Sequence, residues 1–565
     1  MAGTHGRVPG WWRSAVIYQV YPRSFCDSDG DGVGDLQGLI SKLDHLSALG
    51  VDALWLGPVF RSPHDDNGYD IADYQDIDPL FGTLADMDEL ITGLHARGIK
   101  LVIDLVVNHT SDEHPWFQAS RRRQDSKDDW YWWADPKPGH VGGQPGAEPS
   151  TAQSVFSGSA WQWCPVRQQY YLHLFSRKQP DLNWQHPEVR RAVHEMMRWW
   201  VARGVDGFRM DVINLIAKQV PLTDQQPANA ALDPAGPFVG GPRMDEFLHE
   251  MNQAVLAENA LLAVGEAPGV TLEDASRYTD PARDELDMVF QFEHVNLDEQ
   301  PGGGKWALKP LHLPDLKANL ARWQTGLEGR GWNSLYWNNH DQPRIVSRWG
   351  DDSPEFRVAS AKTLGTVLHL LKGTPYVYQG EEIGMTNAQF TRITDYRDLE
   401  TLNHHTAAIA AGADEAALLE AYRVKGRDNA RYPMQWDATA TAGFTTGTPW
   451  LPVHPNHVDI NVAAAVADPA SVWHHYRRLI ELRHTSEVVR EGVFDLLEPG
   501  HEQLFCYTRT LGDQKLLVLA NMSSRECALP GALQVQGTML VASHPAVTTA
   551  DITTLQPWES RVVKL

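Results

Sequence analysis

Short apolar runs alternate with helical patterns over the first two thirds of the chain. Residues 100–107 form a nearly continuous apolar run broken mainly by Asp104, which is typical of a strand buried on both faces. Such runs are followed by stretches with helical periodicity, several of which end at a glycine, as at Gly50, Gly98 and Gly204. This pattern favours an α/β fold with a parallel sheet.

Eight strands and the helices between them follow from this pattern. The predicted strands are residues 15–20, 53–56, 100–107, 205–212, 261–265, 287–292, 333–338 and 375–378. The predicted helices are residues 36–49, 84–97, 187–203, 245–258, 315–328 and 355–371. The simplest closed arrangement of eight strand–helix pairs is a (β/α)8 TIM barrel.

Three segments depart from the alternation. Residues 109–178 are too many for a loop, and they predict a small inserted domain after the third strand. Residues 385–450, approximately, form an excursion that is partly helical at 407–422. After a helix over 470–484, short alternating strands predict a C-terminal antiparallel β-sandwich over 485–565. The predicted strands there are residues 504–509, 515–520, 539–542 and 561–564. Residues 1–108 and 179–484 would then form the barrel.

Charge and composition exclude several classes of partner. Among 565 residues, 49 are Lys or Arg and 72 are Asp or Glu, so the net charge of −23 disfavours nucleic acids and acidic membrane surfaces. We find neither an apolar stretch of about 18 residues nor a signal-peptide pattern. The four cysteines have no metal-binding or disulfide spacing, which favours a reduced compartment. We expect a soluble, cytoplasmic protein that acts as a monomer.

Polar residues stand where five of the predicted strands end, and this is the end at which barrel enzymes carry their chemistry. Arg209 and Asp211 are two residues apart, so they share one face of a strand, and the arginine would keep the carboxylate ionised. Two carboxyl groups on either side of a bond are the arrangement that cleaves glycosides. The strand-end residues are Asp104, Asn108, His109, Arg209, Asp211, Glu266, Asn338, His340, Asp341, Glu381 and Glu382.

At these residues the sequence resembles the α-amylase superfamily, glycoside hydrolase family 13. Its signature segments are matched by residues 104–109, 207–211, 265–266 and 339–341, and a fifth by Gln-Pro-Asp-Leu-Asn at 179–183. Residues 373–387, 426–431 and 433–437 resemble the oligo-1,6-glucosidase group, which usually has Thr where Tyr432 stands. The resemblance spans nearly the whole chain.

The resemblance implies a role for each matched residue. Asp211 would be the nucleophile, Glu266 the general acid and base, and Asp341 would bind ring hydroxyls. Asp66 would close the far end of the pocket and pair with Arg431. A closed pocket implies an exo-acting enzyme. The other substrate-binding residues would be Tyr69, His109, Phe156, Phe175, Gln179, Arg209, Val212 and His340.

The resemblance also implies a substrate, and it leaves several alternative activities open. Val212 after the nucleophile goes with α-1,6 bonds in related enzymes, so we expect a retaining exo-acting α-glucosidase that hydrolyses isomaltose, isomalto-oligosaccharides or short dextrans. The alternatives are an α-1,4-active α-glucosidase, a trehalose-6-phosphate hydrolase, or a sucrose isomerase, whose Arg-Leu-Asp-Arg-Asp loop reads Asn296-Leu-Asp-Glu-Gln300 here. A non-catalytic binding or scaffold protein would lack some of the acids.

An acidic loop follows the first strand. Asp27, Asp29 and Asp31 alternate with small residues, and Gly32 stands sixth, which imitates a Ca²⁺-binding loop. The twelfth position is Gly38, so the glutamate of an EF-hand is missing. The resemblance implies a structural Ca²⁺, with Mg²⁺ as the alternative and no organic cofactor. The ligands would be Asp27, Asp29, Asp31, Asp35 and the carbonyl of Val33.

Overall fold

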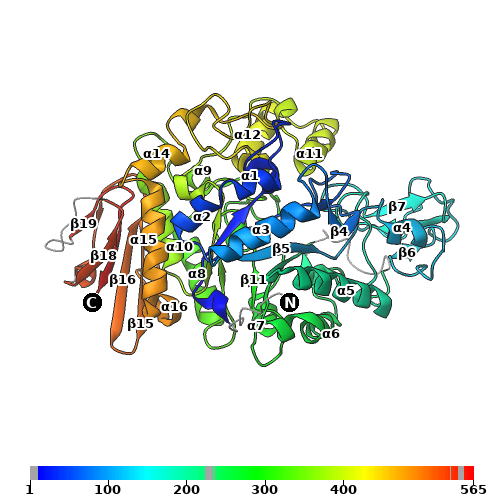
Figure 1. Cartoon of the computed structure of the whole chain (residues 1–565), viewed down its shortest axis with the longest axis horizontal. Coiled ribbons are helices and arrows are strands. Elements are labelled where there is room, and N and C mark those ends of the chain that lie inside the picture. The colour runs from blue at the N-terminus through cyan, green and yellow to red at the C-terminus, as the bar shows by residue number, and fades with distance from the viewer. Residues whose placement is uncertain (1–9, 223–231, 233–235, 535, 545–552) are drawn as a thin grey trace.

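Eight parallel strands form one sheet in the computed structural model, which describes residues 10–222, 232, 236–534, 536–544 and 553–565 (Figure 1). The strand order is β11-β10-β9-β5-β2-β1-β13-β12, and a parallel bridge from Val289 to Asn333 joins the two edges. The predicted (β/α)8 barrel is therefore confirmed. Its strands are β1 (Ile17–Val20), β2 (Ala53–Leu56), β5 (Lys100–Val106), β9 (Gly207–Asp211), β10 (Leu262–Glu266), β11 (Met288–Phe290), β12 (Ser334–Leu335) and β13 (Thr374–Tyr378).

Large side chains fill the barrel interior. Ile17, Trp55, Val102, Met288 and Tyr376 come from five strands and form one buried cluster. Since this interior is packed and apolar, it leaves no room for a substrate, and the polar residues are confined to the strand ends.

Helices surround the barrel; two of the predicted helices are interrupted, and the helices over Leu272–Tyr278 and Ile345–Arg348 were not predicted. The helix predicted over 36–49 is two helices, α1 (Leu36–Ile40) and α2 (Leu43–Leu49), because Lys42 has φ −110° and ψ 7° and leaves the helical conformation. The helix predicted over 245–258 is α6 (Met244–Met251) followed by a π-helical turn at Asn252–Leu256. The other barrel helices are α3 (Leu84–Ala96), α5 (Pro187–Arg203), α7 (Leu272–Tyr278), α8 (Leu313–Gly326), α9 (Ile345–Arg348) and α10 (Arg357–His369).

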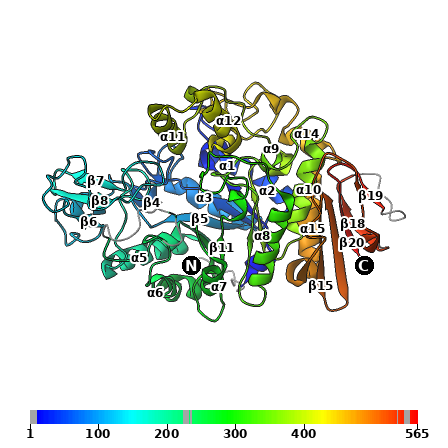
Figure 2. The same ribbon diagram turned by 180° about the vertical axis from the view of Figure 1, so that it is seen from behind.

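The segment after β5 forms a small unit of its own beside the barrel. It contains α4 (Pro115–Ser120) and an antiparallel sheet of β6 (Trp133–Ala134), β8 (Gln169–Leu172) and β7 (Trp161–Cys164). Its buried cluster includes Trp161 and Leu172 and continues into Val212 and Leu215, just after β9. The inserted unit is therefore packed directly against the carboxyl end of the barrel (Figure 2).

A second structure on the same side was not predicted. The strands β3 (Phe60–Arg61) and β4 (Asp73–Ile77) pair antiparallel after β2. The turn between them carries Asp66 and Tyr69, and both side chains are buried.

The excursion after β13 contains α11 (Leu399–Ala410), α12 (Glu415–Lys425) and α13 (Asp428–Arg431). The stretch predicted to be partly helical, 407–422, contains the end of α11 and most of α12, with a turn between them. Gly412 has φ +87°, which ends the first helix, and the Asp414 side chain caps the second by accepting from the Ala416 N–H at 3.3 Å.

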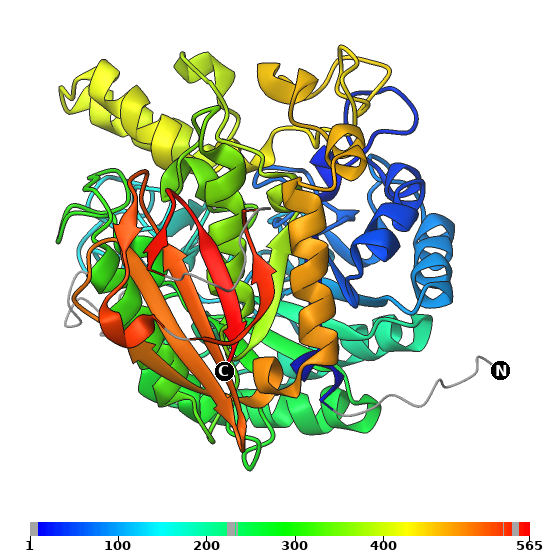
Figure 3. The same cartoon turned by 90° about the vertical axis from the view of Figure 1, so that its left-hand side faces the viewer.

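The C-terminal region is an antiparallel sheet, as predicted, and lies at the opposite end of the molecule from the inserted unit (Figures 1 and 3). The helices α14 (Val462–Ala467), α15 (Val472–Thr485) and α16 (Glu487–Glu491) lead into it. The sheet order is β14 (Val493–Leu497), β15 (Leu504–Leu511), β16 (Gln514–Asn521), β20 (Ser560–Lys564) and β18 (Thr538–Ala542). Its second layer is a two-stranded ribbon of β17 (Cys527–Ala528) and β19 (Thr554–Leu555), and the first strand, β14, was not predicted.

Two further findings concern cysteines and membranes. All four cysteines are free and buried. Among the residues that the structure describes, no helix is both long enough and apolar enough to cross a bilayer.

Candidate active site

A cavity of about 480 Å³ opens at the carboxyl ends of the barrel strands. Its described lining contains no tryptophan. The predicted site residues that line it are Asp66, Tyr69, His109, Phe156, Phe175, Asp211, Val212, Glu266 and Asp341. The remaining four, Gln179, Arg209, His340 and Arg431, are buried behind this surface and bond to residues that line it.

One guanidinium group joins the carboxyl groups of three strands. Arg209 Nη1 lies 2.8 Å from Asp211 Oδ1 and 2.6 Å from Asp104 Oδ1, and its Nη2 lies 2.5 Å from Glu266 Oε2. The indole N–H of Trp55 donates to the other Asp104 oxygen at 3.0 Å. Asp104 therefore fixes the arginine from below, and the arginine fixes the two reactive carboxyl groups relative to each other.

Burial is the largest influence on the pKa of Asp211. It raises the pKa of Asp211 well above its ordinary value, Arg209 opposes it, and the neighbouring Glu266 and Asp104 raise the pKa further. Arg209 favours the ionised form of Asp211, as predicted, but its influence on the pKa is outweighed by burial together with the two carboxyl neighbours. The nearby carboxyl groups and burial thus favour the protonated form of Asp211.

Asp341 has the opposite environment. Burial would raise its pKa, but His340, Arg427 and Arg431 together hold the pKa well below its ordinary value. Arg431 forms an ion pair with Asp341 Oδ1, and Arg427 Nη1 lies 3.4 Å from the same oxygen. Because burial lowers the pKa of His340 to about 3, this histidine is neutral near pH 7, and the two arginines are what keep Asp341 ionised.

The two histidines of the site are neutral and held in place by stacking and hydrogen bonds. The ring of His340 stacks on Tyr69 with centroids 5.3 Å apart and planes 4° apart, and its Nδ1 lies 2.8 Å from Gln19 Nε2. Burial lowers the pKa of His109 to about 4, and its Nε2 lies 3.2 Å from Gln179 Nε2. Both rings are therefore uncharged near pH 7, but only His109 lines the cavity, whereas His340 lies behind it and supports Tyr69.

At the far end of the cavity, the ion pairs differ from the predicted one. Asp66 does not pair with Arg431. Its oxygen lies 3.6 Å from Arg427 Nη2, and the amide of Gln179 donates to its other oxygen at 3.1 Å. Burial raises the pKa of Asp66 to about 7, against the influence of Arg427 and Arg431. Arg431 lies one helical turn after Arg427 and forms ion pairs with Asp341 and Asp398 instead.

Val212 has a strained backbone directly beside the reactive pair. Its φ of +36° and ψ of 43° place a β-branched residue in the left-handed region, where such residues are outliers. In this conformation its N–H donates to Glu266 Oε2 at 3.3 Å, and its side chain lines the cavity. The strained backbone of Val212 therefore points its N–H at Glu266 and its side chain into the cavity.

Sequence reasoning missed several residues of the site. Arg427 and Asp104 stand inside segments that were recognised, but the patterns did not indicate which carboxylate meets which arginine. The mouth of the cavity had no sequence signal, because its residues come from separate loops. The mouth residues are Phe292, Asn296, Glu299, Lys305, Gln342, Glu400 and Lys425.

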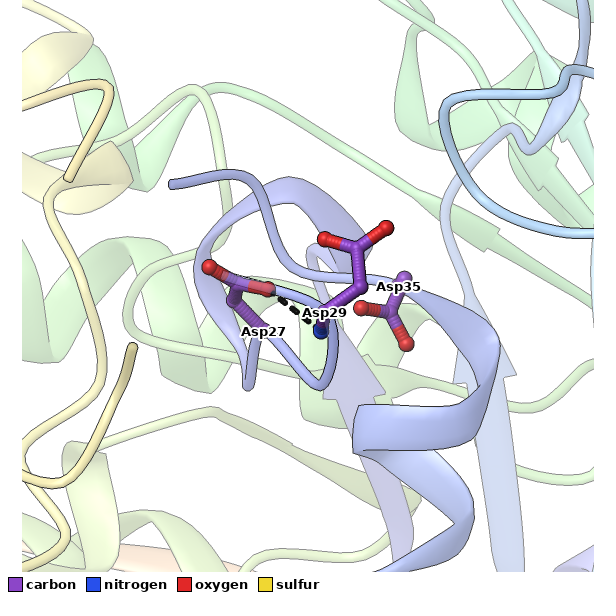
Figure 4. Close-up of side chains that lie close together, drawn as sticks. All are labelled: Asp27, Asp29 and Asp35. Atoms are coloured by element: carbon purple, nitrogen blue, oxygen red, sulfur yellow. Dashed lines mark hydrogen bonds between the residues drawn. The ribbon is translucent and has the colours of Figure 1, made fainter. Parts of the chain in front are cut away.

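The acidic loop brings three of its carboxylates together, away from the cavity (Figure 4). Oxygens of Asp27, Asp29 and Asp35 lie within 4.8 Å of one another. Asp31 lies outside this group, and its Oδ1 accepts the N–H of Val33 at 2.7 Å. Three carboxylates at this spacing repel one another unless a cation lies between them, so the donor set fits a hard divalent ion.

Residues 19–492 match the family described as alpha amylase, catalytic domain. Together with the barrel and the strand-end acids, this match shows that the chain belongs to the α-amylase family of glycoside hydrolases.

Particular relatives resemble the chain over almost its full length. An oligo-1,6-glucosidase of Parageobacillus thermoglucosidasius is 53% identical over 564 residues, which cover 98% of this chain and 99% of that protein. The solved trehalose-6-phosphate hydrolase of Bacillus licheniformis is 44% identical with a TM-score of 0.91, and the match covers 98% of this chain and 99% of that one. The isomaltulose synthase of Klebsiella sp. LX3 is 36% identical with a TM-score of 0.94, covering 99% of this chain and 100% of that one.

Proposed function

We propose that this chain is an exo-acting, retaining α-glucosidase that removes terminal α-1,6-linked glucose from isomaltose, isomalto-oligosaccharides or short dextrans. The observation that carries the proposal is the joint bonding of Asp211 and Glu266 to one guanidinium, that of Arg209. The two carboxyl groups are bonded to Nη1 and Nη2 of the same guanidinium. Such close placement fits retaining enzymes, whose two carboxyl groups are about 5–5.5 Å apart, better than inverting enzymes, in which they are further apart.

The reactive form has the proton of the pair on Glu266 and the negative charge on Asp211 beside Arg209. Glu266 protonates the glycosidic oxygen as Asp211 attacks the anomeric carbon, so the C–O bond breaks and a β-glucosyl ester of Asp211 forms. Glu266, now ionised, takes a proton from water, and the water oxygen displaces Asp211 to give α-glucose. Asp341, ionised between two arginines, accepts hydrogen bonds from ring hydroxyls.

Two observations support α-1,6 specificity. Val212 projects a β-branched side chain into the cavity beside Glu266, which narrows the space for the leaving sugar, and the 53% identical relative is an oligo-1,6-glucosidase. The test is kcat/KM for isomaltose against maltose under the same conditions. We expect isomaltose to be preferred, and a clear preference for maltose would overturn the assignment.

We also propose a structural Ca²⁺, or Mg²⁺, in the acidic loop. Asp27, Asp29 and Asp35 would hold it, with Asp31 and the Val33 carbonyl completing the set expected from the sequence. The ion would neutralise the loop that joins β1 to α1 and would take no part in the reaction. The cytoplasmic location and the monomeric state remain predictions, and the four free cysteines suit a reducing compartment.

A further inference from the structure

Two lysine–glutamate ion pairs stand at the mouth of the cavity. Lys305 Nζ lies 2.5 Å from Glu400 Oε2, and Lys425 Nζ lies 2.5 Å from Glu299 Oε1. All four residues line the cavity, and the side chains of Lys305, Glu299 and Glu400 are 17–23% exposed, against 8–10% for the two reactive carboxyl groups at the strand ends. The pairs therefore face the part of a substrate beyond the glucose that is released.

A further carboxylate contacts one of these two lysines, and one of the two glutamates has a second cationic partner. Lys425 is almost wholly buried, with 2% of its side chain exposed, and its Nζ also lies 3.1 Å from Asp298 Oδ1. Glu400 is shared, because its Oε2 lies 3.4 Å from Arg427 Nε. A buried ammonium group that is fully paired has little capacity left for another anion.

The charge of the described cavity lining is negative overall. Its cationic residues are Lys305, Lys425 and Arg427, and each lies within 2.7 Å of a carboxylate oxygen. Its acidic residues are Asp66, Asp211, Glu266, Glu299, Asp341 and Glu400. A phosphate group entering this mouth would meet carboxylates and would have to break ion pairs to reach an ammonium group.

We propose that Glu299 and Glu400 are specificity residues that restrict the leaving-group site to uncharged sugars by occupying the lysines that would otherwise bind a phosphate. The inference rests on the proposed function only in taking the cavity as the sugar site. A trehalose-6-phosphate hydrolase has nearly the same fold, with a TM-score of 0.92, so discrimination against the phosphorylated sugar would have to come from side chains of the site. Specificity arises here from an unfavourable contact with the wrong ligand.

Competitive inhibition by a matched pair of ligands tests the proposal. The full-length enzyme hydrolyses p-nitrophenyl α-glucoside at pH 7.5 and low ionic strength, and trehalose and trehalose 6-phosphate are added as inhibitors. The measured quantity is KI for trehalose 6-phosphate divided by KI for trehalose. We expect a ratio above about ten for the wild type, and a fall of about tenfold in Glu400→Gln and in Glu299→Gln.

A distant ion pair supplies the control. Glu328 Oε1 lies 2.8 Å from Lys372 Nζ, outside the cavity lining, so Glu328→Gln should keep the wild-type ratio. A wild-type ratio of one or less would overturn the proposal, and so would an unchanged ratio in both mouth variants. The chromogenic substrate contains neither an α-1,6 nor an α-1,4 sugar linkage, so this result is independent of the linkage assignment.

Discussion

At the scale of single residues, Arg209 organises the chemistry of the site. It bonds to Asp104, Asp211 and Glu266, which come from three adjacent strands, and the register that places Asp104 beside Arg209 is set by the β5–β9 pairing. Because the three carboxyl groups share one cation, Arg209 holds the two reactive acids at a fixed position relative to each other.

The first prediction concerns the nucleophile. Asp211→Asn should lower kcat for isomaltose by about three orders of magnitude or more, because the amide cannot form the glycosyl ester, while its oxygen can still accept from Arg209. Steady-state kinetics would measure this. Asp76→Asn, which removes a carboxylate paired to Arg61 on the surface, should leave kcat unchanged. Near-normal turnover in Asp211→Asn would exclude the nucleophile role.

The second prediction concerns Asp66. With a pKa of about 7 in the free site, its carboxyl group is mostly neutral at pH 6 and mostly ionised at pH 8. The ionised form accepts stronger hydrogen bonds from sugar hydroxyls, so KM for isomaltose should fall as pH rises through 7. Asp66→Asn should raise KM and abolish this fall. A variant whose KM keeps the wild-type pH dependence would contradict the role.

Single residues also show which features of the site could be predicted from the sequence. The strand-end acids were predictable, because apolar strands that end in Asp or Glu have no packing reason to do so. The partner of Asp66 was not. Arg427 immediately precedes α13 and Arg431 ends it, so the two are one helical turn apart, and only the tertiary structure decides which carboxylate each one meets.

At the scale of elements, breaks were harder to predict than the elements themselves. The run over 36–49 keeps its apolar periodicity across Lys42, so nothing in the pattern marks the turn between α1 and α2. In the excursion, Gly412 and Asp414 did carry end and start signals, but the alanines on both sides hid them. The short pair β3 and β4 lacks the length that makes a strand recognisable.

The third prediction belongs to the acidic loop. Dialysis against a chelator should lower Tm by several degrees, because Asp27, Asp29 and Asp35 then repel one another, and added Ca²⁺ or Mg²⁺ should restore it. Scanning calorimetry would measure both steps, and titration with each ion would identify the preferred one. Asp27→Asn should remove most of the response, whereas Asp44→Asn should retain it. An unchanged Tm after chelation would argue against the ion.

At the scale of the whole molecule, the barrel and the C-terminal sheet are joined by buried polar contacts. Lys317 on α8 donates to the carbonyls of Glu498, His501 and Leu504 at 2.8, 2.7 and 3.0 Å. The hydroxyl of Tyr507 on β15 donates to the Val367 carbonyl of α10 at 2.7 Å. We therefore expect the two parts to unfold together.

The fourth prediction follows from that interface. Lys317→Met should destabilise the protein by about 3 kcal/mol, because three carbonyls, one of them fully buried, lose a charged donor. Calorimetry should still show one transition, at lower temperature. Lys309→Met, on a partly exposed residue ahead of α8, is the matched control and should change Tm little. Two separate transitions in the wild type would contradict the coupling.

The most direct measurement of the central claim is proton NMR of isomaltose hydrolysis in its first minutes, before the anomers of glucose equilibrate. The account predicts that isomaltose is consumed and that the glucose released from its non-reducing end appears first as the α-anomer, because Asp211 and Glu266 act through two displacements. Release of the β-anomer first, or isomaltose left intact, would contradict it.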